Sequence, residues 1–393
     1  MNADISGNEA TATQGHLGRK RETGVILPCP QNCVVLKSHR TLIYQKEATM
    51  NMDESIGDSG VAITDASMAK TPDTARTAVP SAVMGSAADV PGVAGNATKA
   101  LAPNVPGVAL VLEGGGMRAA HTAGIVTALI EHEVWFPYVC GLSAGSSNAV
   151  NYLSRDAVRT RQAFVDIAGD ERFGGIGSLM RRNGFFNADF LYERAIQDGT
   201  LPFDWDTFRA NPAQLRIQAF ERDTGRTVTW TRDDMTSRVG MASLVRASST
   251  MPFVMKPIEV GGQVMLDGGL GTGAGIPLHM AEEDGFERFF FVATRPTGYR
   301  KEPMGHGTRG IMRRVCAGQP HVFEALATRA ERYNAALDHL AELEREGRAL
   351  VVRPESMPIQ NTETNVERLR AVFDQGHALA EREMDGWLDW LKR

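Results

Sequence analysis

The stretch that decides the fold runs from residue 108 to residue 147 and reads VALVLEGGGMRAAHTAGIVTALIEHEVWFPYVCGLSAGSS. Residues 108–112 form a continuous apolar run, which is typical of a parallel strand buried on both faces. Three glycines end this run, and a helix-length segment leads to a second buried strand, expected at residues 134–140. GLSAG follows at residues 141–145, and a helix is expected at residues 147–154. The stretch therefore predicts a strand-helix-strand unit with a glycine-rich turn after each strand.

The second turn carries a serine flanked by glycines. In a nucleophile elbow, a tight turn between strand and helix projects the serine hydroxyl forward. Side chains two positions from Ser143 would collide in such a turn, so Gly141 and Gly145 fit it, with Leu142 and Ala144 between. The following helix N-terminus also favours developing negative charge. A GxSxG match alone is common in ordinary turns, but its place between strand and helix indicates a nucleophile.

The first turn consists of Gly114, Gly115 and Gly116, followed by Met117 and Arg118. Adjacent glycines leave backbone N–H groups free to face one anion, and acyl transfer needs such groups where the carbonyl oxygen becomes charged. A tight turn without a ligand is one alternative. A dinucleotide loop is another, because the spacing to the following alanines satisfies G-x-G-x-x-A. That loop requires an acidic residue after the next strand, whereas this chain has the serine turn there.

A serine hydroxyl is a weak nucleophile and needs a base. Residues 257–270 read PIEVGGQVMLDGGL, and the central Gly-Gly is a strong signal for a hairpin turn. Asp267 comes at the end of the second expected strand, where Gly268 and Gly269 allow close approach of a substrate. Asp267 is therefore the candidate base, with a purely structural Asp-Gly turn as the alternative.

GGGMR, GLSAG and DGG, in this order, resemble the motifs of the patatin-like phospholipase family. The segments at residues 246–253 (RASSTMPF) and 223–225 (DTG) are also similar to that family, so the resemblance covers residues 108–303. Further segments resemble a bacterial subgroup with a C-terminal helical extension, and they lie at residues 276–278, 292–301 and 373–378.

The resemblance implies a three-layer α/β fold with a mainly parallel central sheet. It also implies a Ser-Asp dyad without histidine, in which Ser143 is the nucleophile and Asp267 the base. Residues 114–118 correspond to the oxyanion hole. The implied substrates are phospholipids or other lipid esters, and no metal or other cofactor is implied. A thioesterase or small-ester hydrolase with the same dyad, or a non-catalytic lipid-binding protein, remains an alternative.

Two departures and one competing arrangement bear on this expectation. The family usually has glycine where this chain has Ala119, and residues 271–275 (GTGAG) are richer in glycine than in the subgroup, which suggests a mobile rim. The order Ser…Asp…His is also that of α/β-hydrolases, and His279 is the first histidine after Asp267. A surface position for His279 is favoured over a triad role.

Composition limits the remaining function classes. The chain has 393 residues and a formal net charge of -5, which gives no electrostatic basis for nucleic-acid binding. Its four cysteines are too scattered for a disulfide framework, and Cys29 and Cys33 lack further ligands at zinc spacing. No segment is apolar enough to span a membrane, and the N-terminus does not resemble a signal peptide. We expect a cytoplasmic protein with at most peripheral membrane contact; the sequence does not indicate an oligomeric state.

Three regions are expected. Residues 1–106 are rich in small residues, without an aromatic from residue 45 onward, and this predicts disorder. Residues 107–303 form the expected catalytic domain, and residues 304–393 a mostly helical extension packed on it. Arg309, Arg313 and Arg314 indicate a solvated helix or, alternatively, a phosphate-facing rim. The final amphipathic helix, residues 366–391, has an apolar end that either inserts at a membrane interface or, as we prefer, packs on the domain: Trp387, Leu388, Trp390 and Leu391.

Overall fold

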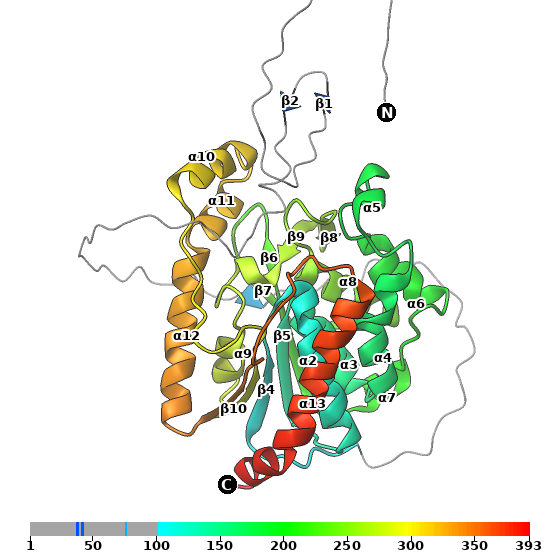
Figure 1. Ribbon diagram of the computed structural model, residues 1–393, viewed down its shortest axis with the longest axis vertical. Coiled ribbons are helices and arrows are strands. Elements are labelled where there is room, and N and C mark those ends of the chain that lie inside the picture. The colour runs from blue at the N-terminus through cyan, green and yellow to red at the C-terminus, as the bar shows by residue number, and fades with distance from the viewer. Residues whose placement is uncertain (1–36, 39–40, 43–74, 77–100) are drawn as a thin grey trace, which may run out of the picture. The chain divides into compact units, whose positions relative to one another are not determined.

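The computed structural model describes residues 37–38, 41–42, 75–76 and 101–393 (Figure 1). The segment predicted to be disordered, residues 1–106, lies almost entirely outside this described part, and its disorder stays a prediction. Within that segment, β1 (Lys37–Ser38) pairs antiparallel with β2 (Thr41–Leu42). Residues 101–393 belong to one compact unit, and β1 and β2 belong to another.

The central sheet has nine strands in the described part of the chain and is mainly parallel. Its main path runs in the order β11-β10-β4-β5-β6-β7-β3, and β9 pairs with β6 and β8. Strands β11, β10, β4, β5 and β6 are mutually parallel, whereas β7 and β9 run antiparallel to β6. The strand bounds are β3 (Ala75–Arg76), β4 (Val108–Leu112), β5 (Tyr138–Leu142), β6 (Gln214–Glu221), β7 (Thr227–Thr231), β8 (Ile258–Val260), β9 (Gln263–Asp267), β10 (Arg288–Val292) and β11 (Ala349–Val352).

Helices cover both faces of this sheet. Alternate residues of each strand point to opposite faces, and because all five residues of β4 are buried apolar residues, both faces need a helical layer. Leu110 and Leu112 pack in one core with α2, α3 and α13, whereas Ala109 and Val111 pack in another with α9 and α12. Figure 1 shows these two helical layers on either side of the sheet. The expected three-layer α/β architecture is therefore confirmed. The helix bounds are α2 (Ala120–Glu131), α3 (Ala144–Leu153), α4 (Ala157–Phe164), α5 (Ile176–Met180), α6 (Ala195–Gln197), α7 (Trp205–Ala210), α8 (Arg238–Ser249), α9 (Leu278–Glu283), α10 (His306–Val315), α11 (Pro320–Ala327), α12 (Arg329–Arg345) and α13 (Val366–Leu391).

The C-terminal extension, residues 304–393, contributes a strand and a closely packed helix to the same fold as residues 107–303. β11 forms an edge of the central sheet, pairing with β10 in parallel from Ala349 to Val352. Helix α13 lies against α2 so closely that a Cβ on Gly376 would be 2.2 Å from the carbonyl oxygen of His121. A Cβ on Gly124 would likewise be 2.2 Å from the carbonyl oxygen of Phe373. Only glycine permits this backbone contact between the two helices.

The end of α13 packs on the domain, as preferred over membrane insertion. Trp387 and Leu391 are both buried, and the Trp387 ring lies edge-on to Phe290 of β10 at 5.1 Å between centroids. The Arg288 guanidinium covers the ring of Trp390 and also donates a hydrogen bond to that residue's carbonyl oxygen. The apolar end of the helix is thus used in the fold.

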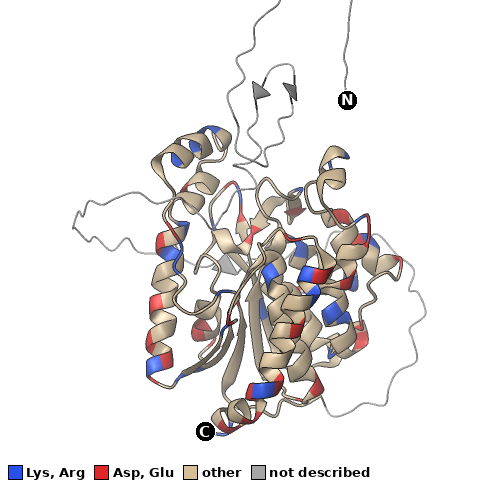
Figure 2. Cartoon of the chain, viewed as in Figure 1, with Lys and Arg blue, Asp and Glu red and all other residues tan. Residues whose placement is uncertain are grey.

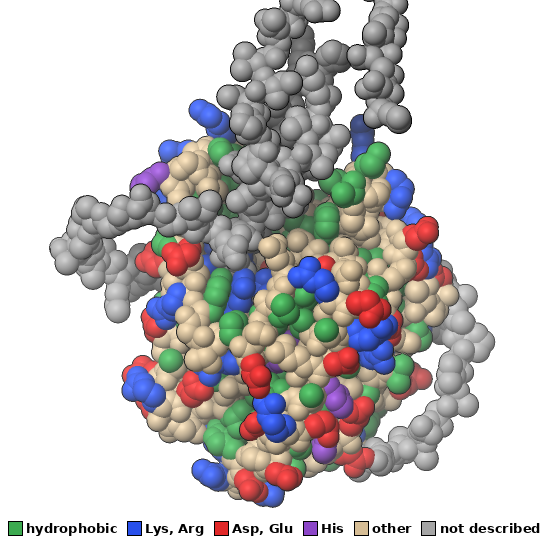
Figure 3. All heavy atoms as spheres, in the orientation of Figure 1, with side chains coloured by type: hydrophobic (Ala, Val, Ile, Leu, Met, Phe, Trp, Pro, Cys, Tyr) green, Lys and Arg blue, Asp and Glu red, His purple; other side chains and the backbone are tan. Residues whose placement is uncertain are grey.

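Charges of both signs are distributed over the molecule (Figure 2). On the face shown in Figure 3, hydrophobic side chains form small groups between charged ones, apart from what the grey atoms cover. Among the described residues, no helix combines the length and apolar character needed to cross a membrane.

Candidate active site

A small cavity lies where β4 and β5 end. It encloses about 30 Å³ of free space, room for roughly one or two water molecules. The lining brings together the predicted site residues Gly114, Gly115, Gly116, Arg118, Leu142, Ser143 and Asp267, and it adds Met251, Gly275, Arg329 and Asn361.

Ser143 occupies the sharp turn between β5 and α3. Its backbone has φ 52° and ψ -130°, a region that residues with a side chain rarely adopt. A Cβ on Gly141 would lie 2.4 Å from the carbonyl oxygen of Gly145, and one on Gly145 would lie 2.3 Å from that of Leu112. The flanking glycines are therefore required by close backbone packing. The Ser143 N–H is held by the Ser248 hydroxyl at 2.9 Å.

The pairing around β6 explains why Ser143 and Asp267 meet, although they are 124 positions apart in sequence. β5 runs parallel to β6 and ends with Leu142 opposite Gln218. β9 runs antiparallel to β6 and ends with Asp267 opposite Ala219. The two strands thus pair with the same edge of β6 from opposite directions. They end opposite adjacent residues of β6, which brings Ser143 next to Asp267.

The Ser143 hydroxyl donates a hydrogen bond of 2.6 Å to Oδ2 of Asp267. The other carboxylate oxygen accepts the Gly269 N–H at 2.7 Å. Burial raises the pKa of Asp267, while the hydrogen bonds from Ser143 and Gly269 and the charge of Arg329 act in the opposite direction. A buried carboxylate with a raised pKa is a stronger proton acceptor than an ordinary aspartate once it is ionised.

The three glycines of the turn after β4 line the cavity. The Gly114 N–H donates to the carbonyl oxygen of Gly275, and the Met117 N–H donates to that of Asn361. Within the described chain, the N–H groups of Gly115 and Gly116 have no acceptor. Of the predicted oxyanion stretch, Gly115 and Gly116 therefore remain as donors, whereas Met117 is already engaged.

The buried carboxylate of Glu113, directly before the glycine turn, links the turn to Thr294 and Tyr333. Glu113 is 2 % exposed and accepts two hydrogen bonds of 2.5 Å, from the Thr294 N–H and the Tyr333 hydroxyl. Thr294 follows β10, and a Cβ on Gly115 would come within 2.8 Å of its side chain. No local sequence pattern indicates a role for Glu113, because its partners come from distant parts of the chain.

The extension contributes directly to the cavity, which the sequence did not predict. The Asn361 carbonyl oxygen binds the Met117 N–H at 3.0 Å and lies 2.5 Å from the position of a Cβ on Gly116. Arg329 and Arg332, both on α12, donate hydrogen bonds to carbonyl oxygens of the loop that follows Asp267. The glycine-rich stretch at residues 271–275, expected to be a mobile rim, is held by these two arginines.

No histidine is among the residues that line the described cavity. His279 lies on α9 with both ring nitrogens buried, so the expected surface position is wrong. Burial, followed by the charge of Arg216, lowers its pKa to about 4. The Asp267 carboxylate bonds to Ser143 and Gly269 instead. The geometry thus favours direct Ser-Asp contact over a triad through His279.

The basic helix α10 is exposed and does not contribute to the cavity lining (Figure 2). Arg309 and Arg313 lie over the ring of Phe323. The solvated-helix interpretation therefore fits these arginines better than a rim at the cavity.

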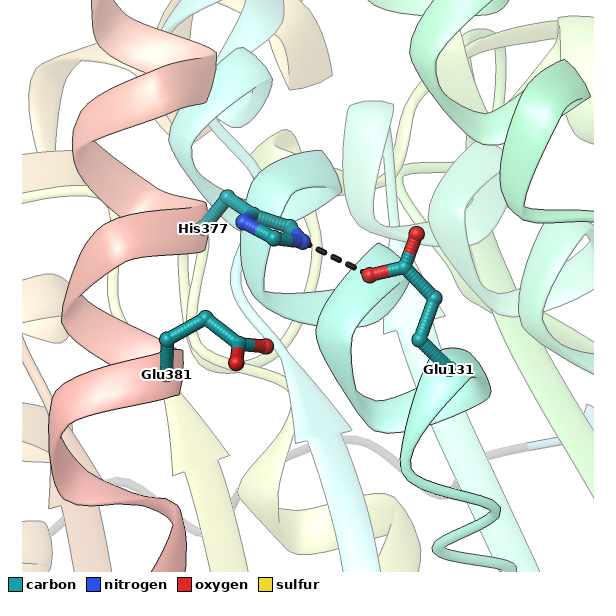
Figure 4. A group of neighbouring side chains, drawn as sticks. All are labelled: Glu131, His377 and Glu381. Carbon is teal, nitrogen blue, oxygen red and sulfur yellow. Dashed lines mark hydrogen bonds and ion pairs between the residues drawn. The ribbon is translucent and has the colours of Figure 1, made fainter.

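The described residues include one group whose ligand atoms could hold a metal ion, formed by Glu131, His377 and Glu381 (Figure 4). Nε2 of His377 lies 2.7 Å from Glu131, and Nε2 of His132 lies 2.9 Å from Glu381. These two pairs join α2 and α13 and account for the side-chain positions without an ion. Glu131 ends α2, roughly 16 Å along the helix from its start beside the glycine turn, so the group is separate from the cavity.

Two family models match different parts of the chain. Residues 110–281 match the family described as patatin-like phospholipase. Residues 319–392 match a domain of unknown function, DUF6363. The first match contains Ser143 and Asp267, and the second contains Arg329 and Asn361.

The chain is also similar to the uncharacterized protein YjjU of Escherichia coli (strain K12), with 25% identity over 221 residues. This alignment covers 53% of the chain and 58% of YjjU, so the chain spans less than two thirds of that relative. Among solved structures, VipD from Legionella pneumophila aligns with a TM-score of 0.39 and 14% identity, covering 71% of this chain and 67% of VipD. A superposition of that quality supports no functional argument.

Proposed function

We propose that this chain, whose residues 110–281 match the patatin-like phospholipase family, cleaves lipid esters with a Ser143-Asp267 dyad. The observation that carries this proposal is the 2.6 Å hydrogen bond from the Ser143 hydroxyl to the buried Asp267 carboxylate. It joins a serine in a strained elbow to a base, beside two backbone N–H groups without acceptors in the described chain.

In the first step, Oγ of Ser143 attacks the acyl carbonyl carbon and its proton passes to Oδ2 of Asp267. The N–H groups of Gly115 and Gly116 stabilise the negative charge that develops on the carbonyl oxygen. Collapse of this intermediate breaks the ester bond, and the departing alcohol takes the proton from Asp267. The product of this step is an acyl-serine.

In the second step, a water molecule attacks the acyl-serine and Asp267 accepts the proton of that water. Collapse then returns the proton to Oγ of Ser143 and releases the fatty acid. One carboxylate therefore serves both half-reactions. The Gly269 N–H keeps it oriented by binding the oxygen that does not contact Ser143.

The decisive test is labelling with a serine-directed fluorophosphonate, followed by hydrolysis of a lysophospholipid, a monoacylglycerol and an acyl thioester. The wild-type protein should be labelled at one serine, and Ser143→Ala should lose both labelling and turnover while keeping its melting temperature. Ser356→Ala, at an exposed serine before α13, is the matched control and should behave as wild type. Undiminished hydrolysis by pure Ser143→Ala protein would refute the nucleophile assignment.

The substrate panel separates the related activities. Preference for the thioester would favour a thioesterase with the same dyad. Labelling without turnover of any ester would favour a lipid-binding protein on this fold.

A further inference from the structure

We propose that Arg329, supplied by the C-terminal extension, is an anion-recognition residue of the cavity and selects acyl esters with a phosphate or carboxylate close to the ester bond. This inference rests on the proposed function of the Ser143 site. It assigns a role to a part of the chain that matches only a domain of unknown function.

The guanidinium of Arg329 has a fixed place beside the dyad. Arg329 is the first residue of α12, is partly buried and lines the same cavity as Ser143. Its Nε–H donates to the carbonyl oxygens of Gly269 and Ala274, at 3.1 and 3.3 Å. Nη2 lies 3.1 Å from the position that a Cβ on Gly269 would take. These contacts hold the planar group over the loop that follows Asp267.

Arg332, one turn later on α12, provides a comparison, because its guanidinium is fully used in hydrogen bonds that hold the structure together. All three of its nitrogens have acceptors: Nε binds the Thr328 hydroxyl, Nη1 binds the Gly271 carbonyl oxygen, and Nη2 binds those of Leu270 and Ala325. In Arg329, by contrast, only Nε is used. Within the described residues, neither Nη1 nor Nη2 of Arg329 has a hydrogen-bond acceptor, and its charge acts on Asp267 without a direct ion pair.

The cavity is a favourable place for a bond to an anion. Arg329 carries its positive charge in a lining that is partly shielded from water, where a charged group interacts more strongly than at the surface. An anion bound there would use the two Nη groups.

The donor geometry specifies the chemistry of that anion. The two Nη groups of a guanidinium form a planar fork that matches two oxygens of one phosphate or carboxylate. Because Arg329 lies over the Gly269 carbonyl oxygen and the Gly269 N–H binds Asp267, the partner of Ser143, an anion on its Nη groups has to be only a few bonds from the ester carbonyl. An acylated glycerol phosphate satisfies this, and so does an acyl ester of a hydroxy acid.

The test compares esters that differ only in the anion: oleoyl glycerol, oleoyl glycerol phosphate and the oleoyl ester of glycerate. For the wild type, kcat/KM should be higher for at least one anionic ester than for oleoyl glycerol. The selectivity is the ratio of kcat/KM for the anionic ester to kcat/KM for oleoyl glycerol. Arg329→Gln should reduce this ratio by about 10- to 100-fold, as expected for loss of a hydrogen bond to a charged group. Arg329→Lys, which keeps the charge without the fork, should recover part of it.

The matched controls separate recognition from structure. Arg314→Gln removes an exposed arginine of α10 and should leave the ratio unchanged. Arg332→Gln should lower the melting temperature and reduce turnover of neutral and anionic esters alike. The phosphate and glycerate esters together show which anion the site takes.

Three results would overturn the inference. One is a wild-type protein that does not prefer either anionic ester. Another is an equal loss on neutral and anionic esters in Arg329→Gln, which would make Arg329 a positioning residue for the loop. The third is failure of the wild type to react with fluorophosphonate, which would remove the proposed function itself and is therefore distinguishable from the first two.

Discussion

The cavity has two sides of different origin. One side consists of strand ends and tight turns between residues 113 and 275, and it holds Ser143, Asp267 and the glycine turn. The other side comes from the extension and consists of Arg329 and Asn361, with Tyr333 behind the glycine turn. The first side carries groups that can exchange protons or stabilise an oxyanion. The second carries side chains and carbonyl oxygens that hold those groups in place and, as we infer, recognise the substrate anion.

The two sides differ in what a substitution should do. A change on the strand side should remove a chemical step, so turnover should fall with little change in stability. A change on the extension side should alter stability or selectivity more than the chemical step. The following predictions test this division, from the largest expected effect to the smallest.

Asp267→Asn should lower kcat by about 10³-fold, within the range typical of losing a general base, because the amide cannot accept the Ser143 proton. His279→Ala is the matched control and should keep most of the activity, since His279 does not line the cavity. The measurement is steady-state hydrolysis of one soluble ester by both variants. Equal losses in the two would replace the dyad with a triad.

The pH dependence provides a second check on Asp267. Ester hydrolysis needs the ionised carboxylate, so kcat/KM should fall as the pH decreases through the raised pKa of Asp267. This acid limb should lie above about 3.9, the value for an unperturbed aspartate. A raised pKa also means that Asp267 stabilises the fold fully below its unfolded-state pKa and loses this contribution as the pH rises through the folded-state pKa. Asp267→Asn should remove that pH dependence of the unfolding free energy.

Gly115→Ala should lower kcat by about 10²-fold, as for loss of one oxyanion donor, with a smaller change in KM. The added Cβ would come within 2.8 Å of the Thr294 side chain, so the turn must shift and take its N–H out of position. Gly307→Ala, in the exposed helix α10, is the control because its Cβ meets nothing within 4 Å. Fluorophosphonate labelling should slow in parallel with turnover. Wild-type labelling and turnover in a folded Gly115→Ala protein would show that the glycines serve only the turn.

Tyr333→Phe should have the smallest effect on turnover, a few-fold at most, and should reduce the unfolding free energy by about 1–3 kcal/mol. The substitution leaves the buried Glu113 carboxylate with one hydrogen bond fewer, on the side away from the substrate. Chemical denaturation measures the stability, and ester hydrolysis of the same sample measures the turnover. A large loss of turnover without a loss of stability would place Tyr333 with the chemical groups and break the division between the two sides.

Local patterns in the sequence were enough to predict the strand side. The run of five apolar residues at 108–112 is β4, as predicted. The Gly-Gly turn at residues 261–262 joins β8 to β9 in the predicted hairpin. The final helix was predicted at residues 366–391, which are the bounds of α13. Boundaries were less accurate elsewhere. The second strand was expected at residues 134–140 but is β5 (Tyr138–Leu142), and the helix expected at residues 147–154 is α3 (Ala144–Leu153).

The sequence by itself determined the α/β fold class, the elbow around Ser143 and the candidate base, because each depends on residues close together in the chain. Only the tertiary structure decided which groups surround them. The contact of Asp267 with Ser143 follows from strand pairing along β6, and those of Asn361 with the glycine turn and of Tyr333 with Glu113 join residues more than 200 positions apart. Arginines are frequent on helix surfaces, so nothing in the sequence distinguishes Arg329 from Arg332. Their difference arises when α12 packs over the loop after Asp267, where one guanidinium finds acceptors for all its nitrogens and the other faces the cavity.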